Sequence, residues 1–313
     1  MGLPASPRQL TVADLAGSAA RRRKEAAIRL AFLATATLSV IITGLIVLAL
    51  IGEAVNFASQ VDPAALLAGG WFPRRDMFDI PTILGGTLVI AGIGMLVAAP
   101  LGIGAAIYLS EYASPRARGL LKPILEMLAA VPSIVLGYFA LQWISPNIVQ
   151  NVCPGGGSVF NMAAAGLAVG VLVTPLIASI AEDAMYAVPG SLREASYGLG
   201  ARKRATSLRV VVPAAVSGIV AALIIGLSRA TGETMIVAIA AGGTGGSLFS
   251  VDPCRQGQTM TAAMTALATG SDQVRGADLA YPSLFFVGLL LFGITLTLNL
   301  VSERFVRRVR LKY

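Results

Sequence analysis

The chain has 313 residues, of which 56% are hydrophobic and only 13% are charged, and its net charge is +8. A typical soluble domain has roughly 25% charged residues, so most of the apolar surface of this chain must face lipid. The sequence contains no histidine and only two cysteines. This excludes Ser-His-Asp catalysis and the common histidine-based zinc sites, and we expect neither a catalytic nor a metal site.

Long apolar segments dominate the chain. A helix needs about 20 apolar residues to cross the ~30 Å hydrocarbon core of a bilayer. These segments are continuously apolar, whereas the strands of a membrane barrel alternate. We therefore predict an all-α, polytopic membrane protein with six transmembrane helices, at 30–51, 82–109, 127–144, 160–181, 210–228 and 279–302.

A further apolar run, 234–251, follows the fifth segment after a short break at 229–233. The distribution of charge decides whether this run is a seventh span. With six spans, 19 of the 24 Lys and Arg fall in the two tails and the loops at 110–126 and 182–209, whereas the opposite loops carry only four. The positive-inside rule then places both termini in the cytoplasm. The fifth helix is expected to run unbroken from Val210 to about Ala240.

The predicted regions are a basic cytoplasmic tail at 1–27, a transmembrane domain at 28–302 and a second basic tail at 303–313. Within the domain, the exported segment 53–81 is expected to lie at the membrane interface, with Trp71 as an aromatic anchor. Cys153 and Cys254 fall in two other exported loops. An oxidising compartment permits a disulfide between them, and two unconnected thiols are the alternative.

The longest cytoplasmic loop, 182–209, contains signals for a short helix. Pro189 and Gly190 suit a turn, and Glu194 follows Ser191 at the spacing of a capping box. Gly198 and Gly200 are expected to end this helix, and a basic cluster follows at 202–204. Such a helix either docks on a partner protein or belongs to a basic loop that contacts lipid headgroups. The residues alone leave both interpretations open.

The same loop resembles the EAA loop of ABC importer permeases, which have the type I, MetI-like fold. The resemblance rests on a Glu-Ala pair, a Gly-x-Gly-Ala run and a following Val-Pro pair. It implies that the loop is the coupling helix, which sits in a groove of a cytoplasmic ATPase. The chain has no Gly-x-x-x-x-Gly-Lys-Ser/Thr run, so ATP and Mg belong to separate ATPase subunits, and the chain itself needs no cofactor and is not an enzyme. The residues that this assigns to ATPase coupling are Glu194, Ala195, Gly198, Gly200 and Ala201.

Residues 70–305 carry a narrower resemblance. Val131-Pro-Ser133 and Arg229-Ala-Thr-Gly-Glu233-Thr-Met235 are similar to motifs of the membrane subunits of phosphate-specific importers. The Met after the last Thr favours the PstC-type over the PstA-type subunit. The resemblance implies one half of an alternating-access pathway for inorganic phosphate in a bacterial inner (plasma) membrane. The implied partners are a homologous permease subunit, two ATPase subunits, an extracytoplasmic phosphate-binding protein and the lipid bilayer, with no nucleic acid.

Arg229 is the main candidate for contact with the substrate. An Arg in a transmembrane helix costs about 2.5–3.5 kcal/mol on insertion scales, so it usually faces a partner or a watery pathway. The guanidinium group matches the geometry of phosphate oxygens, and Glu233 lies four residues later, on the same face of the expected helix. A structural ion pair is the alternative. Weaker pathway candidates are Thr231, Thr234 and Ser133.

Two other functions remain open at this point. One is an ABC permease for another oxyanion, such as sulfate or molybdate. The other is an ion-gradient transporter or channel. Ion-gradient transporters often contain paired repeats with broken helices, and we find no clear internal repeat in this sequence.

Overall fold

The computed structural model describes residues 19–67, 69–242, 246–270 and 279–309. The outer parts of both predicted tails, 1–18 and 310–313, therefore lie outside the described residues. The chain divides into two units, residues 1–50 and 51–313. Each unit is described here by itself.

The first unit is formed by helix α2, which extends over Ala19–Gln60 and whose last turns belong to the second unit. Its apolar side chains between Leu30 and Leu48 are exposed on every side. A helix that is apolar all round requires a nonpolar environment. The stretch Arg23–Gln60 is long and apolar enough to cross a membrane, in agreement with the predicted first span.

Three long helices of the second unit confirm three more predicted spans. Helix α3 (Ile80–Ile107) begins where Asp79 accepts a hydrogen bond from the backbone N–H of Thr82, and it continues into one π-helical turn, η3 (Tyr108–Tyr112). Helix α7 (Met162–Tyr186) begins in the same way at Asn161. Helix α14 covers Ala280–Val309. Asp and Asn are among the preferred N-cap residues, so the sequence sets the starts of α3 and α7 locally.

The third predicted span, 127–144, is placed wrongly. Helix α4 (Pro115–Ala129) ends inside it, and the chain bends by 83° before α5 (Ser133–Phe139), η4 (Ala140–Val149) and α6 (Gln150–Val152). Pro132 is the N-cap residue of α5. The apolar run continues across the bend, so hydropathy does not reveal it. Pro132 is the better signal, because a proline disfavours helix in the residue before it.

The fifth predicted span is also interrupted. The elements α9 (Lys203–Thr206), η6 (Ser207–Val211) and α10 (Val212–Ala214) lead to a 70° bend at Ala215, before α11 (Val216–Thr231). Gly232 caps α11, and α12 (Met235–Val237) and η7 (Ala238–Gly242) follow. The expected continuous helix from Val210 to Ala240 is therefore wrong. The described part has four candidate spans, or six if each bent pair counts as one.

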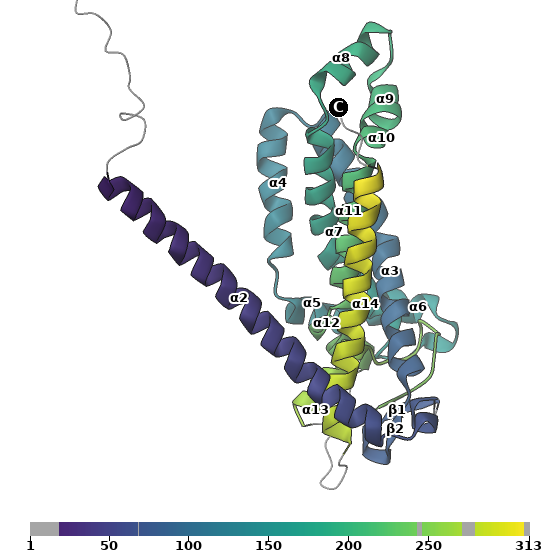
Figure 1. The fold of residues 1–313 in the computed structure, drawn as a ribbon. Coiled ribbons are helices and arrows are strands. Elements are labelled where there is room, and N and C mark those ends of the chain that lie inside the picture. Colours follow the sequence, from purple (N-terminus) through teal and green to yellow (C-terminus); the bar gives the residue numbers. More distant parts are fainter. Residues whose placement is uncertain (1–18, 68, 243–245, 271–278, 310–313) are drawn as a thin grey trace, which may run out of the picture. The chain divides into compact units, whose positions relative to one another are not determined.

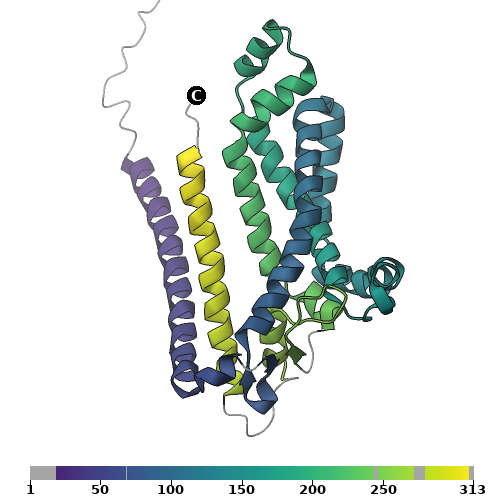
Figure 2. The same cartoon turned by 90° about the vertical axis from the view of Figure 1, so that its right-hand side faces the viewer.

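Glycines allow α3 and α7 to pack closely. A Cβ atom added to Gly170 would lie 2.8 Å from Val97 Cβ and 2.9 Å from the carbonyl oxygen of Gly94. Gly226 brings α11 equally close to Ile177 of α7. Figures 1 and 2 show these three helices side by side. Small residues at helix interfaces permit the close backbone contact on which packing in membranes relies.

A small sheet lies at one end of the second unit. Its antiparallel strands are β1 (Gly70–Phe72), β2 (Met77–Phe78) and β3 (Ser247–Leu248), in the order β2-β1-β3. Trp71 pairs with Phe78 and Ser247 and is fully buried in an apolar cluster that includes Phe57. The expected interfacial role of Trp71 is therefore wrong: neighbouring apolar side chains cover it. Short helices η1 (Pro63–Leu67), η2 (Pro73–Arg75) and α13 (Met260–Ala268) complete this end.

Helix α8 (Gly190–Gly198) lies at the opposite end of the second unit (Figure 1). We refer to these two regions as the α8 end and the sheet end. Helices α3, α7 and α11 extend between them (Figure 1). These three helices therefore connect the α8 end to the sheet end.

Candidate functional site

Arg229 and Glu233 form an ion pair where α11 ends. The Nη1 atom of Arg229 lies 3.0 Å from Oε2 of Glu233. Arg229 is in the last turn of α11, where the helix dipole favours a cation, and Glu233 follows the Gly232 cap. The Arg229 side chain is 48% exposed, whereas that of Glu233 is 3% exposed. Because a guanidinium has five N–H donors, Arg229 retains donors that can bind an anion.

The break that contains Glu233 is held by α13. The hydroxyl of Thr261 donates to the backbone carbonyl of Glu233 at 2.8 Å. The backbone N–H of Met260 donates to the hydroxyl of Thr87 on α3 at 3.0 Å. These bonds fasten the break to α3 through α13. Thr87 and Thr261 lie far apart in sequence, and no local signal connects either of them with Glu233.

The three weaker pathway candidates are placed differently. Thr231 is buried and donates its hydroxyl to the carbonyl of Ser228, and Thr234 donates to the carbonyl of Gly232. Both hydroxyls thus bond to the neighbouring backbone. Ser133 is partly buried in the first turn of α5, one turn before Gly137, whose backbone contacts Ile236 of α12. Ser133 therefore lies on the face of α5 that packs near the break.

The predicted helix in the loop 182–209 is α8. It begins at Gly190 after Pro189, with no side-chain hydrogen bond at its cap. The expected capping box is therefore wrong, because Ser191 already lies inside the helix. The chain leaves α8 after Gly198, and Gly200 has φ +75°, a left-handed conformation that favours glycine. Of the coupling candidates, Ala201 is partly buried, and the others are exposed: Glu194, Ala195, Gly198 and Gly200.

The inward face of α8 is attached to the second unit by a residue that the sequence analysis missed. Arg193 Nη2 lies 2.9 Å from Oε1 of Glu111 in η3. The same guanidinium donates to the backbone carbonyls of Val188 at 2.6 Å and Met185 at 2.9 Å. Ser196, three residues later, shares a hydrogen bond with Thr206. The α8 helix therefore has one attached and one exposed face.

A second buried carboxylate lies near the same end. Glu182 of α7 is completely buried and forms ion pairs with Arg118 and Lys122 of α4. Lys122 also pairs with the exposed Asp183, and Arg118 stacks 3.7 Å from the ring centroid of Tyr186. Arg118 and Lys122 are four residues apart, which places them on one face of a helix. The sequence signal for this cluster is the four-residue spacing of the two cations, together with Glu182 at the end of an apolar run.

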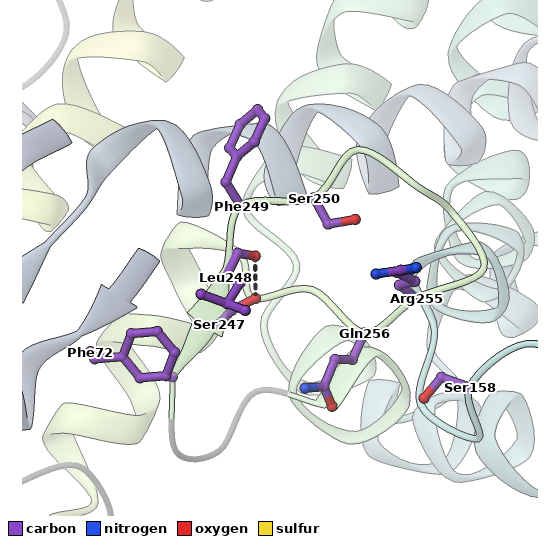
Figure 3. Close-up of a pocket in the computed structure, with 9 residues that line it drawn as sticks. Phe72, Ser158, Ser247, Leu248, Phe249, Ser250, Arg255 and Gln256 are labelled. Carbon is purple, nitrogen blue, oxygen red and sulfur yellow. Dashed lines mark hydrogen bonds between the residues drawn. The ribbon is translucent and has the colours of Figure 1, made fainter. Parts of the chain in front are cut away.

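The sheet end contains a disulfide and a hollow. The bridge joins Cys153 to Cys254. The hollow has a volume of about 610 Å³, and Figure 3 shows the Arg255 and Ser250 side chains pointing toward each other across it. Arg255 also pairs with Asp252 at 3.4 Å. Among the described residues, no group of three or more Asp, Glu and Cys is placed to hold a metal ion.

Two relatives have similar sequences. The chain is 34% identical to the probable ABC transporter permease protein YqgH of Bacillus subtilis over 192 residues, which is 61% of this chain and 61% of that relative. It is 32% identical to the phosphate transport system permease protein PstC of Haemophilus influenzae over 265 residues. This second alignment covers 78% of the chain and 81% of the relative.

Two solved structures have similar folds. A bacterial ABC transporter involved in the import of the acidic polysaccharide alginate matches with a TM-score of 0.62 at 17% identity, over 92% of this chain and 99% of that chain. The methionine ABC transporter MetNI, in inward-facing conformations, matches with a TM-score of 0.52 at 20% identity, over 72% of this chain and 91% of that chain. The predicted MetI-like importer fold is therefore confirmed.

The family that matches the chain is described as "Binding-protein-dependent transport system inner membrane component". The match covers residues 98–311, which include the Arg229–Glu233 pair, α8 and the Arg193 contacts. The chain therefore belongs to the family of inner membrane components of binding-protein-dependent transport systems.

Proposed function

We propose that the chain is the PstC-type permease subunit of an ATP-driven importer of inorganic phosphate. The name of the Haemophilus influenzae relative supports this substrate, as do the phosphate-type motifs around Ser133 and Arg229. The chain provides one half of the pathway, and a homologous, PstA-type subunit provides the other. Two separate ATPase subunits bind ATP and Mg, and an extracytoplasmic phosphate-binding protein delivers the substrate.

The observation that carries this proposal is the state of Arg229. Its side chain is half-exposed although it lies at the end of a largely apolar helix, and its carboxylate partner is buried. Glu233 occupies one side of the guanidinium and leaves its other N–H donors free of that carboxylate. A half-exposed guanidinium is therefore available to an anion that passes beside it, and its planar donors match two phosphate oxygens.

Glu233 has the complementary role in this proposal. It neutralises Arg229 between transport events and competes with phosphate for the guanidinium. This competition limits how tightly the anion is held, because a transport pathway must also release its substrate. The hydrogen bond from Thr261 to the Glu233 backbone holds the break that presents the carboxylate to Arg229.

The orientation follows from charge and from the disulfide. We place the α8 end and both termini in the cytoplasm, because the tails and loops on that side are rich in Lys and Arg and such segments remain cytoplasmic. The sheet end, with its Cys153–Cys254 bridge, lies on the exported side, where disulfides persist. The exposed face of α8, with Glu194, Ala195 and Gly198, then contacts the ATPase.

The test is uptake of radiolabelled phosphate by the complete complex in proteoliposomes. Arg229→Gln should reduce uptake about 10- to 100-fold, because a hydrogen bond to a charged group contributes about 1.5–3 kcal/mol. Glu233→Gln should lower both the maximal rate and the phosphate concentration for half-maximal uptake, since the anion then leaves slowly. Arg116→Gln, which removes an exposed charge of α4, is the control.

Several results would contradict the proposal. Normal uptake by an assembled Arg229→Gln complex would remove the role of Arg229. Equal competition by sulfate or molybdate would favour a different oxyanion as the substrate. Uptake that continues without ATP but follows an ion gradient would favour the other class of transporter. Assembly is checked in each case by co-purification of the ATPase.

A further inference from the structure

Arg193 has a different place in α8 from the residues that are assigned to ATPase contact. Glu194, Ala195 and Gly198 are exposed, whereas Arg193 is directed inward and its side chain is only 20% exposed. Its neighbour Leu192 packs against the core, and Ser196 bonds Thr206. These residues form the attached face of α8, and Arg193 is the charged member of that face.

The bonds of Arg193 reach two helices at once. Its Nε and Nη2 atoms lie 3.3 Å and 2.9 Å from Oε1 of Glu111, which belongs to the π-helical extension of α3. Its Nη2 atom donates to the backbone carbonyl of Met185 in the last turn of α7, and its Nη1 atom donates to that of Val188 in the turn between α7 and α8. One guanidinium therefore fastens α8 to both α3 and α7. A lysine has no planar fork of donors and cannot reproduce this set.

The helices held by Arg193 also contact the segment that carries the ion pair. Gly94 and Gly170 bring the backbones of α3 and α7 into close contact. Gly226 of α11 packs against Ile177 of α7, and Arg229 lies one turn further along α11. A displacement of α8 that is transmitted to α3 and α7 is thus applied to α11.

We propose that Arg193 is a positioning residue that transmits the movement of α8 to α3 and α7. Loss of its bonds to Glu111 and to the two carbonyls uncouples ATP hydrolysis from transport. The inference rests on the proposed function, because it requires that α8 is the element moved by the ATPase. Arg193 has no contact with the substrate in this proposal: it acts through the helices that it holds.

The experiment compares phosphate uptake with ATP hydrolysis in proteoliposomes that contain the complete complex and its binding protein. Arg193→Gln and Glu111→Gln should each lower the phosphate transported per ATP about tenfold, within the range of measured coupling energies, while hydrolysis continues. Arg193→Lys should be intermediate. The exposed Arg116→Gln should leave the ratio unchanged. This ratio distinguishes transmission from a loss of folded complex, which would lower both rates equally.

A crosslink provides a second, independent test. The double variant Arg193→Cys with Glu111→Cys has free thiols at both positions, whereas the native cysteines are already bridged. Without a crosslinker, its transport per ATP should be as low as in Arg193→Gln. A bifunctional thiol reagent of suitable length should restore at least part of the ratio, because it replaces the ionic bond by a covalent one.

Each possible result leads to a decision. A wild-type complex that takes up no phosphate contradicts the proposed function and leaves Arg193 to be judged by the ratio measured with the true substrate. A normal ratio in assembled Arg193→Gln and Glu111→Gln overturns the inference, and so does a crosslinked complex that stays uncoupled. Failure of every Arg193 variant to assemble also overturns it, because Arg193 would then serve folding.

Discussion

Four carboxylates among the described residues of the second unit are buried. Asp79 accepts hydrogen bonds from Thr82 and from the backbone N–H of Gly69, and the other three have cationic partners. Glu111 pairs with Arg193, Glu182 with Arg118 and Lys122, and Glu233 with Arg229. A buried carboxylate without a partner carries a desolvation penalty of several kcal/mol, which explains why the pairs are complete. The pairs differ in their cations: Arg229 is half-exposed, whereas the cations of the other two pairs are largely covered. The two covered pairs join different helices, whereas Arg229 and Glu233 lie only four residues apart, at the end of α11.

At the level of single residues, the Glu182 cluster should dominate the stability of the α8 end. Glu182→Gln leaves two partly buried cations without their shared carboxylate, and we expect the free energy of unfolding to fall by about 3–5 kcal/mol. Asp183→Asn is the matched control, because Asp183 is the 63% exposed neighbour that pairs with the same Lys122. An exposed ion pair contributes about 1 kcal/mol or less. Unfolding by SDS in mixed micelles measures both values.

A small loss of stability in Glu182→Gln, similar to that of Asp183→Asn, would contradict this interpretation. It would mean that water reaches the cluster and screens its charges. The two variants differ by one sequence position and remove the same charge. The comparison therefore isolates the effect of burial.

The contact between α3 and α7 is close and depends on glycines. Gly94, Gly102, Gly166 and Gly170 each have atoms of the opposite helix within 3.4 Å of the position that a Cβ atom would occupy. Dispersion contacts and close backbone approach hold such helices together in lipid, where the hydrophobic effect contributes little. Enlargement of any of these residues must separate the helices.

We expect Gly170→Val to destabilise the second unit by about 1–3 kcal/mol, the usual effect of overpacking. Its side chain would collide with Val97 and with the backbone of Gly94. Gly104→Val is the control, since the space around Gly104 is open and this glycine also lies inside α3. Equal thermal unfolding temperatures for the two purified variants would show that the interface has room to adapt.

The long helices could be predicted from the sequence, but their interruptions could not. Apolar length and the caps at Asp79 and Asn161 locate α3 and α7 because both signals are local. The bends before Ser133 and at Ala215 lie within or beside apolar runs, so a hydropathy pattern does not reveal them. Gly232 was read as part of a continuous helix, although a glycine beside two charged residues is a reasonable place for a helix to end.

The candidate site could be predicted in part for the same reason. Arg229 and Glu233 are four residues apart, and their pairing survives the end of the helix because Glu233 follows immediately after the cap. The contacts of Arg193 with Glu111 and of Thr261 with Glu233 join residues 82 and 28 positions apart. Pairing over such distances depends on tertiary packing, which one sequence does not reveal.

At the scale of the whole second unit, the disulfide is the longest covalent constraint. It joins cysteines that are 101 positions apart and so connects the loop after α6 with the loop before α13. In the chain-entropy account, a closed loop of about 100 residues gains roughly 4.7 kcal/mol. Helices that are already inserted in a bilayer restrict the reduced chain as well, so this value is an upper bound.

Reduction of the bridge should therefore lower the thermal unfolding temperature of the purified chain, with a loss of stability of up to about 4.7 kcal/mol. The measurement is a thermal scan in detergent with and without reductant. The double variant Cys153→Ser with Cys254→Ser should unfold at the temperature of the reduced chain and show no response to reductant. Any response of that variant would trace the effect to another target.

The separation of the two cysteines also has a consequence for how the protein is made. A ribosome that adds about 5–20 residues per second needs roughly 5 to 20 seconds to proceed from Cys153 to Cys254. During this interval Cys153 cannot form its disulfide, because Cys254 has not yet been synthesised. Helices α7 and α11 are made and inserted in the same period. The bond that closes the sheet end can therefore form only after α7 and α11 have been synthesised.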